Sequence, residues 1–286
     1  MKVQRIGTYK TGFKYFNKNS EITDEKKIDF IKSLKIPPVY DKVTIINDNK
    51  IIAYGYDSKN RKQVIYHPKF ILSQNNIKFK KIKQSIKYFS RLKRKIKKDI
   101  NGDDINKICA IIITLIIECG FRIGNKKYEI DNNSYGLTTL KKKHIFIEKK
   151  YIKIDFIGKK NVRNVAICKN KEIYKFFFDR LNNIGEEEYI FKHNDKTITS
   201  NIVNKYLYNF YKKFDLKITT KDLRTLNANT LFMKFFNKNI NSKNPIKKSI
   251  EDTALKLHNT YAVCKKNYID PNIIIFAENQ LNKNKN

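Results

Sequence analysis

The stretch that decides the fold runs from His144 to Cys168 and reads HIFIEKKYIKIDFIGKKNVRNVAIC. Apolar and polar residues alternate along it, which is typical of strands that turn one face toward a core. The pattern predicts three antiparallel strands, over residues 144–148, 151–157 and 162–167. The turn between the last two strands puts Lys159 at a hairpin tip, from which it could reach into a groove. On this spacing alone, an ordinary charged turn is the better interpretation.

The sequence on both sides of this meander is helical in pattern. Residues 80–98 carry apolar side chains at three- and four-residue spacing with Lys and Arg between them, which predicts a helix with a basic face. A solvated face, a calmodulin-target helix and a membrane-surface helix share that pattern. Residues 104–118 are apolar nearly all round, which predicts a buried helix that ends at Gly120, just before Arg122.

The rest of the C-terminal half is also expected to be mainly helical. We predict helices over 172–181, 200–214, 220–236 and 245–257, with a short turn around Tyr268 and a polar, frayed tail over 278–286. Ser200 and Thr220 are the expected N-caps. Thr220 as N-cap would place Arg224 in the first turn, where free backbone N–H groups favour phosphate.

The first 76 residues are patterned as strands. Residues 43–46, 51–54 and 63–66 are short β-prone runs, and a hairpin signal separates the first two. We therefore predict an α+β protein with two domains. A small β-rich N-terminal domain, residues 1–76, would precede a larger, mainly α-helical domain, residues 77–286, that carries the three-stranded meander.

The net charge points to a polyanionic partner. Lys and Arg number 61 against 27 Asp and Glu, giving a formal charge of +34. An AT-rich genome inflates Lys but does not equally explain so few acids, so nucleic acid is the expected partner. Only eight of the 61 basic residues are Arg, and Arg122 and Arg224 are two of these eight. Because Lys is the usual basic residue in this chain, an Arg indicates a position that needs the planar guanidinium fork, which binds phosphate through two hydrogen bonds.

Cysteine and histidine spacing argues against a metal site. The four Cys and four His form no CxxC or HxxxH pattern, so zinc is not expected. Reduced thiols in a cytosol-like compartment are the default. The N-terminus shows no apolar signal core, and the longest apolar run is too short to span a bilayer.

Six short stretches stand out in order along the chain. They are Gly12–Tyr15 with Ile36–Pro38, Gly55–Gln63, Arg122–Tyr128 with Ser134–Leu140, Phe156–Lys159, Lys221–Thr225, and Asn259–Thr260 followed by Tyr268. In this order they resemble the motifs of the type IB DNA topoisomerases of the small bacterial and poxvirus-like (large DNA virus) group. The resemblance covers nearly the whole chain. No single stretch decides it, but six in order are highly specific.

The resemblance implies roles for five residues. Tyr268 would attack a DNA phosphodiester and form a 3′-phosphotyrosyl intermediate. Arg122 and Arg224 would stabilise charge on the non-bridging oxygens, and Asn259 would donate a further hydrogen bond there. Lys159 would protonate the leaving 5′ oxygen. The enzyme would nick one strand, relax positive and negative supercoils and religate, with no ATP, metal or other cofactor.

The resemblance also implies how DNA is held. Residues expected to contact DNA are Lys59, Arg61, Lys62, Gln63, Tyr66, Lys127 and Tyr128. From the residues alone, the loop over 57–63 could equally be a solvated turn. The two domains would form a C-shaped clamp around duplex DNA. A monomer in the cytoplasm is expected, either in a bacterium or in a viral factory or virion, and composition does not distinguish these sources.

The chain departs from the family pattern at several positions. Asn259 stands where poxvirus enzymes have His and bacterial members have Asn. His258 replaces a usual Gly and Tyr261 a usual Pro. Val64 and Asn125 also replace residues of the poxvirus pattern, so preference for a pyrimidine-rich pentamer is a hypothesis.

Two other functions stay open at this stage. A tyrosine recombinase or integrase uses a similar Arg-Lys-Arg-Tyr set, but usually carries His where this chain has Lys221. Recombinases also have a helical arm-binding domain rather than a β-rich one. A non-catalytic basic DNA-binding protein would need the charge but none of the separated motif residues.

Overall fold

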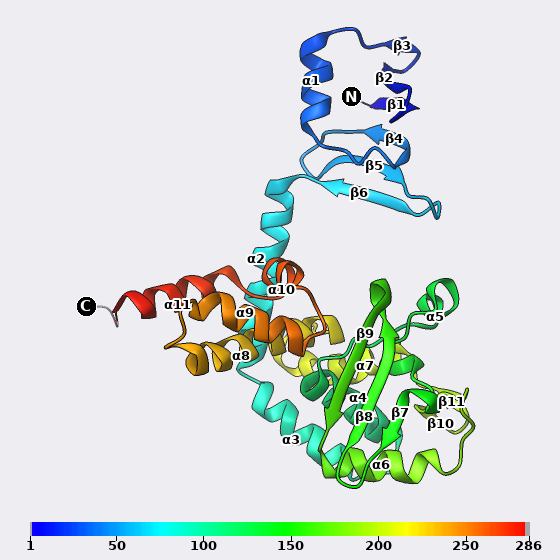
Figure 1. Ribbon diagram of the computed structural model, residues 1–286, viewed down its shortest axis with the longest axis vertical. Helices are drawn as coiled ribbons and strands as arrows, with labels where there is room; N and C mark the ends of the chain where they lie inside the picture. The colour runs from blue at the N-terminus through cyan, green and yellow to red at the C-terminus, as the bar shows by residue number, and fades with distance from the viewer. Residues whose placement is uncertain (1, 284–286) are drawn as a thin grey trace. The chain divides into compact units, whose positions relative to one another are not determined.

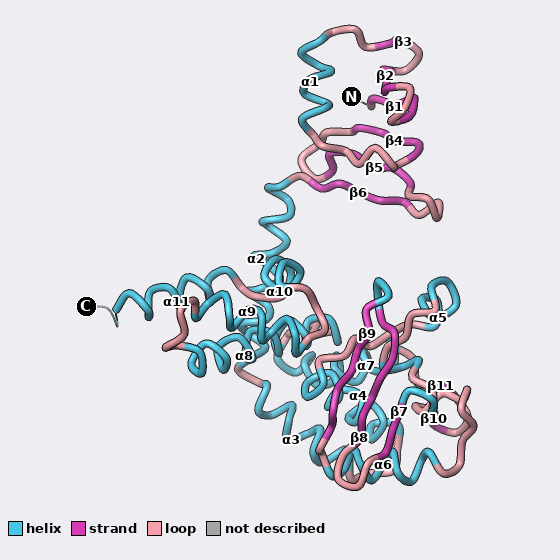
Figure 2. Tube along the Cα trace, in the orientation of Figure 1, coloured by secondary structure: helices cyan, strands magenta, loops and turns pink. Residues whose placement is uncertain are grey.

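The computed structural model describes residues 2–283 and divides the chain into two compact units, Met1–Phe79 and Lys80–Asn286. Helix α2 (Pro68–Ile86) runs across the point of division. Figures 1 and 2 show strands gathered in the first unit and helices predominating in the second. The chain therefore mixes helices with antiparallel sheets, as the sequence predicted.

The N-terminal unit is built on one antiparallel sheet with the strand order β3-β2-β1-β4-β5-β6. Its elements are β1 (Val3–Thr8), β2 (Gly12–Asn17), β3 (Ser20–Glu21), α1 (Glu25–Ser33), β4 (Asp41–Ile45), β5 (Ile51–Tyr56) and β6 (Lys62–Tyr66). Val3, Val43 and Ala53 point into its core, where Ile31 of α1 joins them. The three strands predicted from the sequence correspond to β4, β5 and β6.

Strand β1 escaped prediction because a charged residue occupies a core-facing position. Arg5 is buried, and its guanidinium donates to the carbonyls of Ile36, Pro37, Pro38 and Tyr40. It also lies over the ring of Phe13, 4.2 Å from the centroid. An inward Arg breaks the apolar alternation by which a strand is recognised.

The C-terminal unit carries a three-stranded antiparallel sheet in the order β7-β8-β9. Its strands are β7 (Ile145–Ile147), β8 (Ile152–Gly158) and β9 (Val162–Cys168). Ile152, Ile154 and Phe156 of β8 face the core. The predicted meander is confirmed, because its alternation placed these side chains correctly on one face.

Helices make up most of the remaining C-terminal unit. They are α3 (Phe89–Ile100), α4 (Ile105–Cys119), α5 (Lys126–Asn132), α6 (Lys171–Leu181), α7 (Ser200–Tyr211), α8 (Thr220–Asn239), α9 (Pro245–Lys256), α10 (Tyr261–Asn267) and α11 (Pro271–Lys283). Short elements complete it: β10 (Lys192–His193), β11 (Lys196–Thr197), η1 (Leu137–Thr139), η2 (Lys142–His144), η3 (Lys159–Asn161) and η4 (Lys212–Phe214). Helix α4 is buried along most of its length, as its all-round apolar sequence predicted.

Three sequence expectations need correction. The single helix expected over 80–98 is the end of α2 followed by α3, because Tyr88 leaves helical geometry and stacks on Phe214 at 3.7 Å. The N-caps of α7 and α8 are Thr199 and Thr219, one residue before those expected. The tail expected to fray is helical over residues 278–283 as part of α11, while 284–286 lie outside the described residues.

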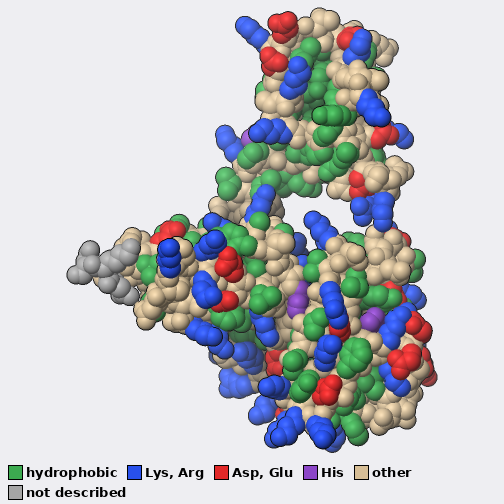
Figure 3. Space-filling model, in the orientation of Figure 1, with side chains coloured by type: hydrophobic (Ala, Val, Ile, Leu, Met, Phe, Trp, Pro, Cys, Tyr) green, Lys and Arg blue, Asp and Glu red, His purple; other side chains and the backbone are tan. Residues whose placement is uncertain are grey.

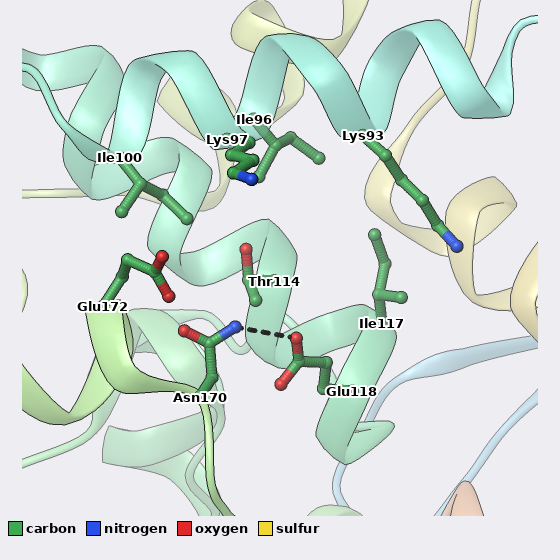
Figure 4. Close-up of a pocket in the computed structure, with 9 residues that line it drawn as sticks. All are labelled: Lys93, Ile96, Lys97, Ile100, Thr114, Ile117, Glu118, Asn170 and Glu172. Carbon is green, nitrogen blue, oxygen red and sulfur yellow. Dashed lines mark hydrogen bonds between the residues drawn. The ribbon is translucent and has the colours of Figure 1, made fainter.

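The C-terminal end of α4 is tied to the start of α6 by a hydrogen bond beside a cavity. A cavity of about 390 Å³ lies beside it, with Lys93 and Lys97 of α3 on one wall and Glu118 and Asn170 on the other (Figure 4). Asn170 Nδ2 donates to Glu118 Oε1 at 3.0 Å, while its own Oδ1 caps α6. This bond ties the first turn of α6 to the last turn of α4.

Gly120 ends α4 in a left-handed conformation with a φ of 70°. A Cβ at this position would lie 2.1 Å from the carbonyl oxygen of Lys256, at the end of α9. The backbone after α4 and the backbone after α9 are thus in direct contact. Only glycine permits both the φ and the approach.

Among residues 2–283, no helix combines the length and the apolar character that crossing a lipid bilayer requires.

Replacement of Gly120 by Ala tests this contact. Gly120→Ala should lower the free energy of unfolding by more than about 2 kcal/mol, because left-handed strain adds to a backbone clash. Urea unfolding would measure the loss. Gly185→Ala is the control, since its Cβ would meet only the Glu188 carboxylate at an ordinary 3.6 Å. Equal effects of the two changes would contradict the close approach.

Candidate active site

One pocket of the C-terminal unit collects side chains from distant parts of the chain. Its volume is about 340 Å³. Four of the five residues predicted to be catalytic line it: Arg122, Lys159, Arg224 and Tyr268. The other lining residues are Ile123, Gly124, Tyr128, Ser134, Tyr135, Thr220 and Lys221. The pocket is therefore rich in positive charge and holds three phenols, among them that of Tyr268, together with two guanidinium groups.

Arg224 is the most buried charge of this pocket, with 3 % of its surface exposed. It lies near the start of α8 and donates to two carbonyls, that of Gly120 and that of Leu257. Its Nε atom is buried without a hydrogen-bond partner. Burial lowers the pKa of Arg224 to about 10, which leaves the guanidinium charged at neutral pH. A buried donor without a partner is unusual and favours a ligand that supplies the acceptor.

Arg122 and Asn259 form a second polar pair at the site. Arg122 Nη2 donates to Asn259 Oδ1 at 2.5 Å. The backbone of Arg122 is held by the N–H of Leu137, which donates to its carbonyl at 3.0 Å. The Nδ2 atom of Asn259 is buried and has no partner in the described structure. The structure thus adds the fifth predicted residue to the cluster and leaves another donor available.

Tyr268 directly follows α10 and forms its C-cap. Asn229, buried in α8, holds the backbone from Tyr268 to Asp270: its Nδ2 donates to the Tyr268 carbonyl at 2.9 Å, and its Oδ1 accepts from the Asp270 N–H at 2.8 Å. The Arg224 guanidinium lies 5.5 Å from the centroid of the Tyr268 ring. The ring is therefore placed by a fixed backbone next to a fixed charge.

The pKa of Tyr268 reflects this neighbourhood. Burial by itself would raise the pKa of the phenol. The positive charges of Arg224, Arg122 and Lys221 outweigh burial, so the pKa of Tyr268 is lowered from its usual value of 10.0. A phenol that loses its proton more readily is a better nucleophile at neutral pH.

Lys159 reaches the pocket from the tip of the β8–β9 hairpin. It begins the short η3 turn and is exposed, and the two residues after it, Lys160 and Asn161, have left-handed φ values of 62° and 59°. The hairpin is tied to the stretch that also holds the Arg122 backbone, because Tyr135 N–H donates to the Ile157 carbonyl at 2.8 Å and Leu137 N–H donates to the Arg122 carbonyl. An exposed tip on an anchored sheet can carry an amine into a groove.

Comparison with known proteins agrees with this geometry. The family model of the eukaryotic DNA topoisomerase I catalytic core matches residues 59–269, a span that includes all five clustered residues. The chain is 31 % identical over 281 residues to DNA topoisomerase 1B of Acanthamoeba polyphaga mimivirus, covering 89 % of this chain and 81 % of that protein. The chain belongs to the type IB DNA topoisomerases.

Two further likenesses add detail. DNA topoisomerase 1B of vaccinia virus (strain Copenhagen) is 27 % identical over 286 residues, covering 93 % of this chain and 88 % of that protein. The solved structure of the XerH site-specific recombinase bound to a palindromic difH substrate aligns with a TM-score of 0.45 at 15 % identity, covering 72 % of this chain and 51 % of that one. Family membership favours the topoisomerase interpretation over a recombinase or a non-catalytic DNA-binding protein.

Two residues of this topoisomerase site that sequence reasoning did not select are Asn229 and Lys221. Lys221 lines the pocket, and Asn229 fixes the backbone of Tyr268. The sequence did contain a feature that could have pointed to Asn229, because Asn229 lies with Asn227 among apolar residues of a buried helix segment. Buried amides in such a segment need partners and often fix a neighbouring backbone.

His258 adjoins the topoisomerase site without entering its pocket. Its ring lines a different cavity of about 380 Å³, together with Cys119 and residues of β9 and α9. Among residues 2–283, no three His, Cys, Asp or Glu side chains lie close enough together to hold a metal ion.

The loop predicted to contact DNA in the N-terminal unit is organised by Asp57. The carboxylate accepts from the backbone N–H groups of Lys59 and Arg61 and from the side chains of Arg61 and Gln63. The Arg61 bonds hold the pKa of Asp57 at about 2. Lys62 lies over the ring of Tyr54, 3.9 Å from the centroid. The loop is therefore ordered by its own contacts.

The remaining predicted DNA contacts are exposed side chains. Tyr66 packs beside Phe70 in the N-terminal unit, with ring centroids 5.5 Å apart. In the C-terminal unit, Lys127 and Tyr128 lie on α5, and Tyr128 also lines the pocket. Figure 3 shows Lys and Arg at the surface of both units, with fewer Asp and Glu among them.

The influence of Arg224 on Tyr268 can be tested directly. Arg224→Gln should raise the pKa of Tyr268, because the strongest favourable charge on the phenolate is lost, and should slow DNA cleavage by about 10²- to 10³-fold. The phenolate absorbance that disappears with Tyr268→Phe measures the pKa in each background. Arg180→Gln is the matched control, since Arg180 also donates to a carbonyl, that of Ile190. An unchanged Tyr268 titration in Arg224→Gln would refute the role given to this charge.

Proposed function

We propose that this topoisomerase cuts one strand of duplex DNA by direct attack of Tyr268 on a phosphodiester. The observation that carries the proposal is the convergence of Tyr268, Arg122, Arg224 and Lys159 on one pocket. The phenolic oxygen bonds to phosphorus, the bond from phosphorus to the 5′ oxygen breaks, and the products are a 3′-phosphotyrosine and a 5′-hydroxyl end. The phenolic proton is released as the new bond forms.

The guanidinium groups stabilise the transition state. Charge builds up on the non-bridging oxygens as the phenol adds to phosphorus, and Arg122 and Arg224 provide fixed positive charge there. The buried Arg224 Nε and Asn259 Nδ2 atoms have no protein partners, so both can donate to these oxygens. Because the donors are held before DNA binds, little reorganisation is needed during the reaction.

Lys159 acts as the general acid in this proposal. The leaving 5′ oxygen would otherwise depart as a poorly stabilised alkoxide, and an ammonium group can give it a proton. An exposed lysine on the β8–β9 tip, at the rim of the pocket, supports this assignment. In religation the same amine takes that proton back, since the reverse reaction follows the same path.

The covalent intermediate explains how supercoils are released without ATP. The phosphotyrosine bond conserves the energy of the broken phosphodiester, so the 5′-hydroxyl can attack it and restore the strand. While the strand is open, the downstream duplex can rotate in either direction. Supercoils of both signs are therefore substrates.

DNA is held by both units in this proposal. The loop ordered by Asp57 and helix α5 supply Lys59, Arg61, Lys62, Gln63, Tyr66, Lys127 and Tyr128 for contacts with phosphates and base edges. The two units close as a clamp around the duplex. A monomer suffices, because one chain carries the whole catalytic set. The mimivirus and vaccinia relatives are viral, which supports a viral source. Work in a cytoplasmic factory or the virion is part of this proposal.

Plasmid relaxation tests the nucleophile. The intact protein should relax both positive and negative supercoils with EDTA present and ATP absent, and Tyr268→Phe should abolish this because it lacks the attacking oxygen. A protein–DNA adduct trapped by denaturant should disappear in the same variant. Tyr261→Phe is the control, since Tyr261 begins α10, the helix that Tyr268 caps. Relaxation that survives Tyr268→Phe would move the nucleophile to another tyrosine.

A change of leaving group tests Lys159. Lys159→Ala should slow cleavage by about 10²- to 10⁴-fold on ordinary DNA, because the 5′ oxygen leaves without a proton. With sulfur in place of the bridging 5′ oxygen, the variant should cleave nearly as fast as the intact protein, since a thiolate leaves unaided. Lys160→Ala, the neighbouring change on the same turn, should be close to neutral. A Lys159→Ala defect that persists with the sulfur substrate would assign Lys159 to DNA binding.

A further inference from the structure

The loop between α9 and α10 contains a residue in an unfavourable backbone conformation. His258 has a φ of 50°, in the left-handed region that side chains with a Cβ adopt reluctantly. The backbone here closes the end of α9, because the N–H groups of His258 and Asn259 donate to the carbonyls of Leu255 and Ala254. Glycine would fit this position without strain. The imidazole offsets this strain through contacts with the end of α4 and the residue after Gly120.

The His258 ring makes two such interactions, one with the last residue of α4 and one with the segment that follows it. Its Nε2 lies 2.9 Å from the carbonyl oxygen of Cys119, so Nε2 carries the proton and donates. Its ring also stacks on Phe121, with centroids 5.0 Å apart and an interplanar angle of 18°. One side chain thus binds the α9–α10 loop to both neighbours of Gly120.

These two segments carry the proposed catalytic groups. Arg122 lies one residue beyond Phe121, and Asn259 immediately follows His258. Arg224 bridges the same two segments from α8, donating to Gly120 on one and to Leu257 on the other. The relative placement of all three groups therefore depends on how the two segments are joined.

We propose that His258 is a positioning residue of the topoisomerase reaction. It fastens the α9–α10 loop to the end of α4 and the segment after it, and so keeps Asn259, Arg122 and Arg224 in fixed positions relative to one another. The inference rests on the proposed function of these three groups. His258 itself lies outside the pocket and does not contact the reacting phosphate.

The surroundings of His258 give this role a pH signature. Burial is the main cause that lowers the pKa of His258 below its usual 6.5, and the charges of Arg224, Lys256 and Arg122 act in the same direction against the bond to Cys119. Lys238 of α8 and Asp252 of α9 line the same cavity as the ring. The ring is therefore neutral at pH 7. As the pH falls through the lowered pKa, a new positive charge appears beside Arg224 and Arg122 and the arrangement is disturbed.

The test compares His258→Gly and His258→Gln with the intact protein. Single-turnover cleavage of a duplex by excess protein would be measured over about pH 5 to 9, with DNA affinity measured separately. His258→Gly should fold, because glycine suits the left-handed backbone, and should cleave about tenfold to a hundredfold more slowly with unchanged affinity. His258→Gln keeps an N–H donor at a similar reach and should recover much of the rate.

The pH profile separates positioning from a general structural effect. The intact protein should lose cleavage toward acid pH as His258 protonates, and both variants should lack that part of the decline. Asp215→Gly is the matched control, since Asp215 is exposed, has a φ of 53° and lies away from the pocket. It should leave the rate and its pH profile unchanged.

The outcomes are distinct from those that test the proposed function. An intact protein that relaxes DNA, with a His258→Gly variant that cleaves equally fast at every pH, overturns this inference alone. Equal slowing by Asp215→Gly, or an acid decline that persists in both His258 variants, also overturns it. An intact protein that relaxes no DNA overturns the proposed function and the inference together.

Discussion

The site depends on one buried guanidinium. Arg224 can be charged inside the protein because its two terminal nitrogens, Nη1 and Nη2, donate to the carbonyls of Gly120 and Leu257. These carbonyls are available because α4 ends at Gly120 and α9 ends at Leu257, and helix ends leave backbone groups without helical partners. The arginine thus satisfies two helix ends and is held by them. Gly120 makes this geometry accessible, since a Cβ would separate the two segments.

Local patterns predicted the elements but not their meeting point. The meander over 144–168 and the buried helix over 104–118 follow from apolar spacing, which is encoded in neighbouring residues. By its spacing, Lys159 lies in an ordinary charged turn. Only its place in the order of the six motifs along the chain suggested a catalytic role. The structure brings it to the pocket of Arg122 and Arg224 through contacts between distant segments. Such contacts use backbone carbonyls, which every residue possesses, so they cannot be predicted from the pattern of side chains.

The predictions that were wrong also failed because of contacts between distant segments. Strand β1 was missed because Arg5 occupies a core-facing position and is satisfied by carbonyls more than thirty residues away. The helix over 80–98 was drawn as continuous because its apolar spacing continues past Tyr88, where stacking on Phe214 interrupts it. In each case a long-range contact overrode a correct local tendency. The motif residues could still be predicted, because they were recognised by their order along the chain and not by any contact in the fold.

The two hydrogen bonds of Asn229 have a mechanical consequence. In the proposed reaction, a rotating duplex pulls on the protein through the phosphotyrosine linkage, and the load enters the chain at Tyr268. Asn229 binds the carbonyl of that residue and the N–H of Asp270 just after it, and it belongs to α8, a helix packed into the core. Torque is therefore passed into a buried helix rather than absorbed by a loose loop. The phenol can stay in line with the strand end while the DNA turns, ready for resealing when rotation stops.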